Sequence, residues 1–198
     1  WSSAIERWKA EARDFGWVPA VLSASETGAI AYAAHGMRVI GLGDEAILRP
    51  DRFDLRRVSL TPVRHAARRA ARAGLSVRIR RQADISVDEL AEITARADAW
   101  RGEEPDRGFS MALNRTGDPA DARILHVSAH TVDGALAGVL SFVPWGRHGV
   151  SLDVMRRSPR APNGVTELMV SELLTRAAEH GVRRVSLNFC MFRRVYAD

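Results

Sequence analysis

The chain has 198 residues, of which 46% are hydrophobic and 27% charged, a balance that excludes an intrinsically disordered protein and allows one large or two small domains. No apolar run reaches about 18 residues, so the sequence offers no membrane-spanning helix, and its first residues lack a signal-peptide pattern. The single cysteine, Cys190, excludes an internal disulfide, and no spacing of histidine and cysteine indicates a metal site.

Hydrophobic periodicity predicts alternating helices and strands along the first half of the chain. In chain order we expect an amphipathic helix, a strand, a short helix, two strands, a basic helix, a strand and a further helix over residues 1–14, 18–22, 26–34, 37–42, 46–48, 61–73, 76–80 and 87–100. Ser86 and Glu89 form a capping box at the start of the last of these helices.

The second half predicts three strands, a helix and a final strand over residues 124–131, 136–144, 150–155, 165–180 and 182–189. Asp133-Gly134 is typical of a tight hairpin turn between the first two strands, and Gly181 is typical of a helix C-terminal cap. The order of these elements matches the core of the acyl-CoA N-acyltransferase fold.

Positive charge is concentrated around the predicted helix at 61–73. Between Arg52 and Arg81 the sequence has ten arginines against one acid. Four arginines lie at helical spacing along one side of this helix: Arg64, Arg68, Arg69 and Arg72. Like charges at this spacing repel by roughly a few tenths of a kcal/mol per pair, which favours a polyanionic partner, either nucleic-acid phosphates or anionic lipid headgroups. A solvated face in an arginine-rich protein, with 28 arginines and one lysine, is the alternative.

The strand predicted at 150–155 contains one carboxylate. Burial of Asp153 among valine and methionine is costly unless a cation or hydrogen-bond donors compensate for it, and Arg156 is the nearest candidate in sequence. Strict alternation places residues three apart on opposite faces, so both side chains face one cavity only if the strand bulges or ends there. Such a pair suits an aminoacyl group, with Asp153 for an ammonium and Arg156 for a carbonyl or phosphate oxygen. A structural ion pair that closes the strand is the alternative.

The loop at 157–164 argues against coenzyme A. In the acyl-CoA N-acyltransferase fold the loop at this helix N-terminus cradles a pyrophosphate. Here the loop has two prolines and one glycine, and it lacks the Arg/Gln-x-x-Gly-x-Gly/Ala pattern that presents several backbone N–H groups. Glu167, at the start of the helix, would repel a phosphate there. We therefore expect no cofactor.

Three motifs of the second half, supported by runs at 41–46, 108–113 and 139–145, resemble the cytosolic catalytic domain of the phosphatidylglycerol lysyltransferases, also called multiple peptide resistance factors. The motifs are Asp153-Val-Met-Arg156, Asn163-Gly164-Val-Thr-Glu167 and Val185-Ser186-Leu-Asn188-Phe189. The resemblance is strongest to the actinobacterial form, in which a membrane domain and this domain precede a fused lysyl-tRNA synthetase.

The resemblance implies a mixed α/β (α+β) fold of tandem acyl-CoA N-acyltransferase-like (GNAT-like) subdomains with mixed, mostly antiparallel sheets. We expect residues 1–58 to form the N-terminal part of the first subdomain. Residues 59–81 would supply the basic helix and the following strand, which link the halves. Residues 82–198 would form the second subdomain, which carries the aminoacyl site.

The activity implied by the resemblance is transfer of a lysyl group from lysyl-tRNA to phosphatidylglycerol at the cytoplasmic face of the cell membrane. It implies that Asp153, Arg156 and Ser186 contact the lysyl group, and that Glu167 and Asn188 line the site. The four arginines of the basic helix would bind tRNA or the anionic membrane surface. Fusion to a membrane domain and a lysyl-tRNA synthetase is also implied, as is an aromatic and basic segment beyond residue 198.

The reaction makes modest chemical demands, because the donor ester is already activated and needs only deprotonation of the acceptor, positioning and oxyanion stabilisation. No serine–histidine–acid pattern supports a covalent acyl-enzyme. We expect His126 and His130 to be packing and surface residues, and His148 to lie in a loop beside the Asp153 strand. The general base is unassigned. Asp153 favours a cationic aminoacyl group, whether lysine, arginine or ornithine.

Two other classes of function remain open from the sequence. An acetyl-CoA-dependent N-acetyltransferase would bind coenzyme A. A non-catalytic tRNA- or membrane-binding module attached to a lysyl-tRNA synthetase would show salt-dependent binding and would form no lipid product.

Overall fold

The computed structural model describes residues 1–102 and 115–191, and it divides the chain into two compact units. The first unit contains residues 1–43 together with the chain from Met191 onward, and the second is Asp44–Cys190. The run at 108–113 and the side chain of Cys190 lie outside the described part. The subdomain boundaries implied by the resemblance, at residues 58 and 81, stay a prediction.

The first unit contains the two helices predicted for it, α1 (Ser2–Asp14) and α2 (Glu26–Ala34). Trp8 packs edge-to-face on Tyr32, with 6.2 Å between the ring centroids, and Lys9 donates to the carbonyl of His35. These contacts hold the two helices against each other.

The strands predicted at 18–22 and 37–42 are wrong, because both segments are irregular. Their apolar side chains are largely exposed, with Val18 93% and Ile40 66% accessible. A short apolar run becomes a strand only where a neighbouring strand pairs with it. These two runs lack such a neighbour within the described chain.

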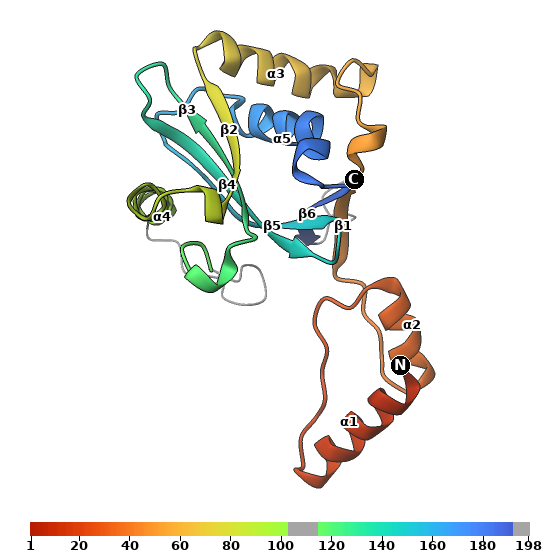
Figure 1. Cartoon of the computed structure of the whole chain (residues 1–198). Coiled ribbons are helices and arrows are strands. Elements are labelled where there is room, and N and C mark those ends of the chain that lie inside the picture. Colours follow the sequence, from red (N-terminus) through yellow and green to blue (C-terminus); the bar gives the residue numbers. More distant parts are fainter. Residues whose placement is uncertain (103–114, 192–198) are drawn as a thin grey trace. The chain divides into compact units, whose positions relative to one another are not determined.

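The second unit is built on a six-stranded sheet in the order β1-β6-β5-β4-β3-β2 (Figure 1). The strands are β1 Gly43–Leu48, β2 Ser76–Arg81, β3 Leu125–His130, β4 Leu136–Trp145, β5 Gly149–Arg157 and β6 Arg184–Met191. The pairs β2–β3, β3–β4 and β4–β5 are antiparallel, and β5–β6 is parallel. The prediction of a mixed, mostly antiparallel sheet is confirmed.

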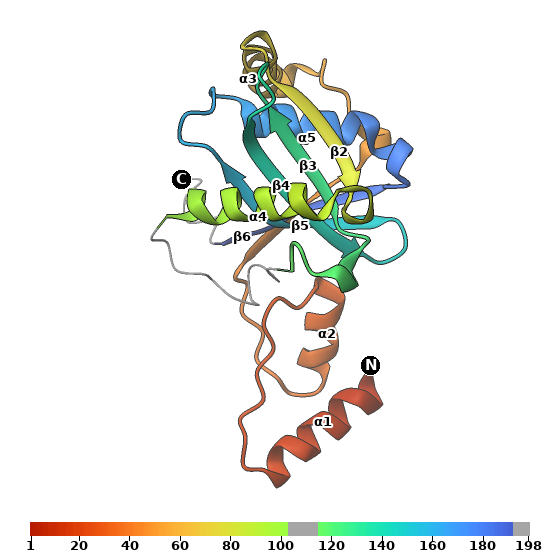
Figure 2. The ribbon, with the colours of Figure 1, turned by 60° about the vertical axis from the view of Figure 1, so that its left-hand side comes forward.

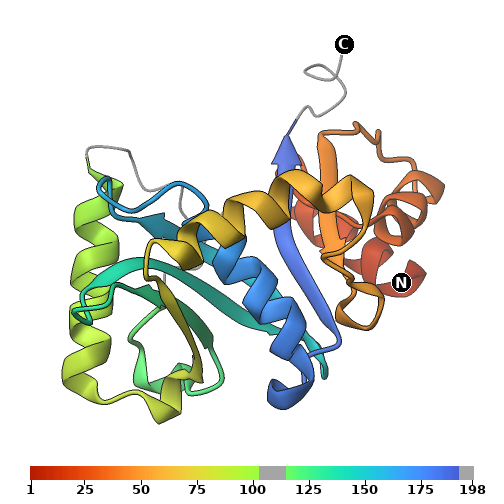
Figure 3. The same cartoon turned by 90° about the horizontal axis from the view of Figure 1, so that it is seen from above.

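Helices cover both faces of this sheet, as seen from above in Figure 3. Helices α3 (Thr61–Arg72) and α5 (Val165–Arg176) lie on one face, and α4 (Val87–Arg101) lies across the strands on the other (Figure 2). Short 3-10 segments join them: η1 Pro50–Arg52, η2 Val58–Leu60, η3 Gln82–Asp84, η5 Pro119–Asp121 and η6 Ala177–His180. The larger apolar core lies under α3 and α5, and a smaller one around Ile93 and Val139 lies under α4.

Helix α3 approaches the start of α5 closely. Gly164, the N-cap of α5, has φ +98°, and a Cβ added there would lie 2.1 Å from the Ala66 carbonyl oxygen. On the same helix Ala67 and Ala70 are buried. The small alanines of the basic helix therefore make close packing possible. Thr61 is the first residue of α3, and its hydroxyl accepts a hydrogen bond from Arg64.

Within the described ranges, the helices are all too short or too polar to cross a lipid bilayer.

Candidate functional site

A bulge in β5 shapes the candidate site. Leu152 lies opposite Phe142 of β4, but Val154 lies opposite Ser141, so Asp153 is an extra residue on β5. The extra residue reverses the alternation beyond it. Arg156 therefore lies opposite Val139, a member of the apolar cluster under α4. The bulge that the three-residue spacing required is present.

One hollow between α4 and the sheet brings Asp153 and Arg156 together. It contains about 530 Å³ of empty space, part of which is open to solvent. Apolar side chains such as Ile93 and Val139 form part of its wall. Seven of the lining residues have polar side chains: Thr94, Asp98, Arg101, Thr116, Ser141, Asp153 and Arg156. Of the residues predicted to contact the lysyl group, the first two thus share one cavity.

Five of these polar residues were missed by sequence reasoning. Asp98 and Arg101 lie three residues apart on α4, and therefore on one face of the helix. Ser141 interrupts an apolar strand, and its hydroxyl is 3.2 Å from that of Thr116. The helical spacing of Asp98 and Arg101 and the lone serine can be seen in the sequence. The position of α4 over β4 and β5, which brings these residues together, cannot be seen there.

Ser186 and Asn188 lie on β6, beside the bulge and outside the described lining of the hollow. Ser186 is fully buried, and its hydroxyl donates to Glu45 Oε1 at 2.6 Å. It also accepts from the backbone N–H of Asn188 at 3.0 Å. These contacts tie β6 to the edge strand β1, and Glu45 is a partner that the sequence did not indicate.

Asn188 fixes the backbone next to Asp153. Its Nδ2 donates to the carbonyl of Leu152 at 3.0 Å, immediately before the extra residue. The regular β5–β6 register extends only to Ser151 and Ser186, so this side-chain bond continues the connection beyond the paired segment. Asn188 itself has φ +68°, a conformation that asparagine tolerates better than most residues. Its role in this geometry is to position the bulge.

Glu167 lies on the opposite face of the sheet from Asp153. It lines an open depression of about 890 Å³ at the start of α5, together with Val63 of α3, Arg157 and Asn163. Because Arg156 and Arg157 are neighbours on a strand, their side chains reach different faces. The structure therefore does not bring Glu167 into the hollow of Asp153 and Arg156.

The four arginines of α3 separate into two groups. Arg64 is half-buried and donates to the carbonyl of Leu55 and to the hydroxyl of Thr61, both at 3.0 Å. The other three are exposed: Arg68, Arg69 and Arg72. His65, which the sequence analysis did not select, lines a surface groove with Arg69 and Arg72. The exposed basic face thus consists of His65 and three arginines, and Arg64 holds the chain before α3.

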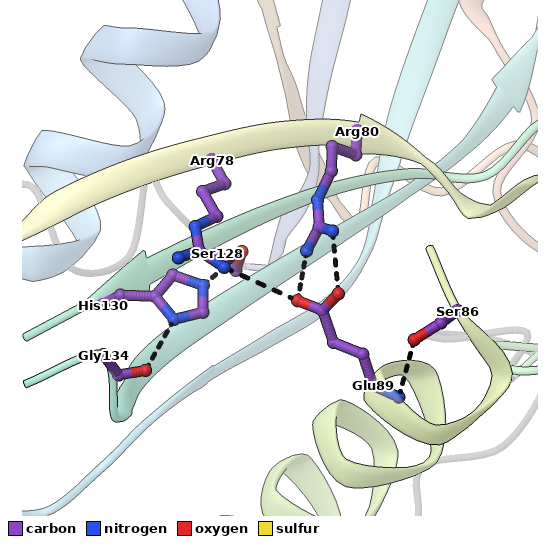
Figure 4. A network of polar contacts seen from close by, with 7 residues as sticks. All are labelled: Arg78, Arg80, Ser86, Glu89, Ser128, His130 and Gly134. Carbon is purple, nitrogen blue, oxygen red and sulfur yellow. Dashed lines mark hydrogen bonds and ion pairs between the residues drawn. The ribbon is translucent and has the colours of Figure 1, made fainter. Parts of the chain in front are cut away.

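A polar network anchors α4 to the sheet (Figure 4). Arg80 of β2 donates to both carboxylate oxygens of Glu89, at 2.8 and 2.5 Å. Arg78 lies 3.8 Å from the same carboxylate. The hydrogen bonds from Arg80 are the main cause that holds the pKa of Glu89 below its usual value. The Ser86 hydroxyl accepts from the Glu89 N–H at 3.3 Å. Half of the predicted capping box is therefore present, and the carboxylate of Glu89 bonds to Arg80.

His126 and His130 are both buried on the α4 side of the sheet. His130 bonds to the Ser128 hydroxyl at 3.0 Å and to the Gly134 carbonyl at 3.2 Å. The Gln82 amide nitrogen donates to the carbonyl of Asp118, and the amide oxygen accepts from the Gly117 N–H at 3.1 Å and from His126 Nε2 at 3.0 Å. Burial, with a smaller contribution from Arg80, lowers the pKa of His126 to about 4. The prediction of packing residues holds for both histidines, but neither lies at the surface.

The charged side chains of the hollow are complementary to a small cationic ester. Its carboxylates suit ammonium groups, and its guanidiniums suit carbonyl and phosphate oxygens. Among the described residues, no group of three or more His, Cys, Asp or Glu side chains could hold a metal ion.

Comparison with known proteins shows relatives that match the whole chain. The whole chain, residues 1–198, matches the family model described as "Phosphatidylglycerol lysyltransferase, C-terminal". The lysylphosphatidylglycerol biosynthesis bifunctional protein LysX of Rhodococcus jostii is 53% identical over 198 residues, and its counterpart in Mycolicibacterium gilvum is 52% identical over 196. These matches cover 100% and 99% of this chain and 18% of each relative. The chain therefore spans less than a fifth of the length of these relatives.

Two solved structures share the fold. L-PGS from Bacillus licheniformis matches with a TM-score of 0.82 at 21% identity, covering 98% of this chain and 59% of that one. A C-terminal domain from Agrobacterium fabrum, provisionally assigned as a lysylphosphatidylglycerol synthetase, gives a TM-score of 0.79 at 20% identity, covering 96% and 60%. The fold class expected from the resemblance is confirmed.

Proposed function

We propose, since the chain belongs to the family of phosphatidylglycerol lysyltransferase C-terminal domains, that it transfers a lysyl group from lysyl-tRNA to phosphatidylglycerol. The observation that carries the proposal is the hollow shared by Asp153 and Arg156. A carboxylate and a guanidinium on one wall match the ammonium and the carbonyl or phosphate oxygens of an aminoacyl ester.

In the proposed reaction a glycerol hydroxyl of the lipid attacks the carbonyl carbon of the lysyl ester. The new ester bond forms as the bond to the terminal ribose oxygen of tRNA breaks, and the hydroxyl proton passes to that oxygen. Asp153 holds a lysyl ammonium and Arg156 steadies the ester. Asn188 keeps the bulge in place through its bond to Leu152. Such positioning accounts for much of the catalysis expected of an already activated donor.

The larger ligands are assigned to the outer surface. The exposed Arg68, Arg69 and Arg72 carry positive charge suited to RNA phosphates or lipid headgroups. Lysyl-tRNA, phosphatidylglycerol and the cytoplasmic face of the membrane are the proposed partners. Fusion to a membrane domain and a lysyl-tRNA synthetase is proposed as well, in line with relatives of which this chain spans 18%.

The two other classes of function are less well supported. An acetyl-CoA-dependent enzyme would place phosphates at the start of α5, where Glu167 lines the depression and Pro162 has no N–H to donate. A purely binding module would not require Asp153 and Arg156 to share a hollow. The family of the chain favours neither.

Replacement of Asp153 by Asn tests the proposal. Cells that express the whole protein are fed labelled lysine, and their lipids are separated by thin-layer chromatography. We expect Asp153→Asn to reduce lysyl-lipid at least about 100-fold, because a bound ammonium loses its charged partner. The matched control is Asp88→Asn, an exposed aspartate on α4 that is outside the hollow, and it should retain normal output.

Normal lysyl-lipid from the Asp153→Asn cells would contradict the assignment. The absence of lysyl-lipid from cells with the unmodified protein, together with salt-dependent RNA binding, would favour the binding module. Unchanged thermal unfolding of the purified variant chain would exclude misfolding as the cause of a loss.

A further inference from the structure

The hollow has a second pair of charged residues that the family motif does not include. Asp98 and Arg101 of α4 line it from the helix side, and Asp153 and Arg156 line it from the sheet side. Each wall therefore carries the same pattern, an aspartate followed three residues later by an arginine. On α4 this spacing places both side chains on one face. On β5 the bulge produces the same result.

We propose that Asp98 is a second ammonium-binding residue of this hollow, which makes the site selective for an aminoacyl group with two positive charges. The inference rests on the proposed function, because it concerns the same lysyl ester. A lysyl ester carries an α-ammonium beside the ester carbonyl and an ε-ammonium at the end of its side chain. Two carboxylates on facing walls provide one partner for each.

The exposure of the two carboxylates determines which ammonium meets which aspartate. The hollow lies between α4 and the sheet that it covers, a layer too thin for a nucleic acid. The ester end, attached to tRNA, therefore stays at the mouth, and the lysyl side chain points inward. Asp98 is exposed and Asp153 is half-buried. Asp98 then meets the α-ammonium near the ester, and Asp153 meets the ε-ammonium further in.

The two aspartates thus recognise different groups of the ligand. A carboxylate that a ligand desolvates without supplying a cation costs binding free energy, so each aspartate disfavours a ligand without the matching ammonium. Asp153 selects for the charged side chain, which separates lysine from neutral amino acids. Asp98 selects for the free α-ammonium, which separates an aminoacyl ester from an N-acylated ester.

Three small amides distinguish the two roles in calorimetry with the purified chain. Lysinamide has both ammonium groups, norleucinamide only the α-ammonium, and 6-aminohexanamide only the ε-ammonium. For Asp98→Asn we expect the affinity for lysinamide and norleucinamide to fall roughly tenfold, the lower end for a hydrogen bond to a charged group. The affinity for 6-aminohexanamide should change less than about twofold. Asp153→Asn should show the reverse pattern.

Asp88→Asn on the same helix is the matched control, and it should bind all three amides like the unmodified chain. Asp98→Glu keeps the charge and should retain most of the α-ammonium preference. Unchanged norleucinamide binding by Asp98→Asn would overturn the inference, even if Asp153→Asn still abolished lysyl-lipid formation in cells. Failure of lysinamide to bind the unmodified chain would count against both the inference and the proposed function.

Discussion

His126 is a titratable residue that the fold keeps neutral. It is 1% exposed on β3, and its Nε2–H is held by the Gln82 amide oxygen. Its cross-strand neighbour is Ser141, which lines the hollow. Protonation would place a cation in a buried layer that already contains Arg80. The pKa of His126 is therefore lowered to about 4, mainly by burial and secondly by Arg80.

This lowered pKa predicts a loss of stability in mild acid. Above about pH 6.5 neither the folded nor the unfolded chain protonates this ring, and the full stability is present. Between about pH 6.5 and the folded pKa of about 4, the unfolded chain takes up the proton first. The free energy of unfolding should fall by up to about 3 kcal/mol from this residue. Chemical denaturation at several pH values measures it.

The comparison variant for this prediction is His126→Asn, which has a neutral side chain at all pH values. Its free energy of unfolding should depend less steeply on pH between 4 and 6.5, although it is lower at pH 7. Equal slopes for His126→Asn and the unmodified chain would show that His126 is not held neutral.

At the scale of elements, the contact between α3 and α5 depends on one glycine. Gly164 has a positive φ and lies against the backbone of Ala66, where a side chain has no space. On the other face of the sheet, α4 is held by the ion pair between Arg80 and Glu89. The contact between α3 and α5 depends on steric fit, and the contact of α4 with the sheet is electrostatic. Together they fix the helices on both sides of the sheet.

Substitution of Gly164 by Ala should be strongly destabilising. The new Cβ would lie 2.1 Å from the Ala66 carbonyl oxygen, so α3 and α5 must move apart. We expect a loss of about 3 kcal/mol or more in the free energy of unfolding, from overpacking and from the positive φ. Gly181→Ala is the matched control, because it also has a positive φ but no atom within 4 Å of the added Cβ. It should cost only about 1 kcal/mol.

Thermal unfolding of the two glycine variants measures the loss of stability that each substitution causes. Similar losses for both would mean that α3 does not press on the start of α5. That result would also weaken the placement of the exposed basic face, because α3 is positioned by this contact.

For the whole molecule, the net charge of +5 is unevenly distributed. The exposed basic face of α3 lies on the side of the sheet opposite the hollow under α4. A polyanion bound there would not compete with the lysyl group for Asp153. The division would leave the two proposed ligand surfaces free to act at the same time.

Replacement of Arg68, Arg69 and Arg72 together by Gln should weaken binding of a tRNA acceptor-stem duplex. Each phosphate that an arginine no longer neutralises lowers the slope of log affinity against log salt by about 0.9, so three such phosphates would lower it by about 2.7. Titrations at a series of salt concentrations measure the slope. Arg64→Gln is the control, and it should keep the slope but lower stability, since Arg64 bonds to Leu55 and Thr61. Equal slopes for the triple variant and the unmodified chain would rule out this surface.

The sequence predicted the second unit better than the first. Its strands, its hairpin and the helices α3, α4 and α5 are present near the expected bounds, because each has strong periodicity and a turn or cap residue at its ends. In the first unit the apolar runs at 18–22 and 37–42 had the right composition for strands. Composition does not reveal whether a neighbouring strand is available for pairing.

The candidate site was predicted in part, for a similar reason. Asp153 and Arg156 share a strand, so their relation followed from local geometry. Glu167 is close to them in sequence, but the sheet separates it from the hollow. Asp98 is distant in sequence but lines the same hollow. These relations depend on how helices pack on the two faces of a sheet, which no short motif specifies.

The extra residue in β5 links the spacing of the motif to the path of the backbone. In a straight strand an aspartate and an arginine two residues apart would share a face, whereas three apart they would not. Removal of Val154 or Met155 would therefore let an unkinked strand present both charges to α4. Any relative that keeps the two charged residues three positions apart must also keep the kink. Substitutions along β5 are consequently less constrained than changes in its number of residues.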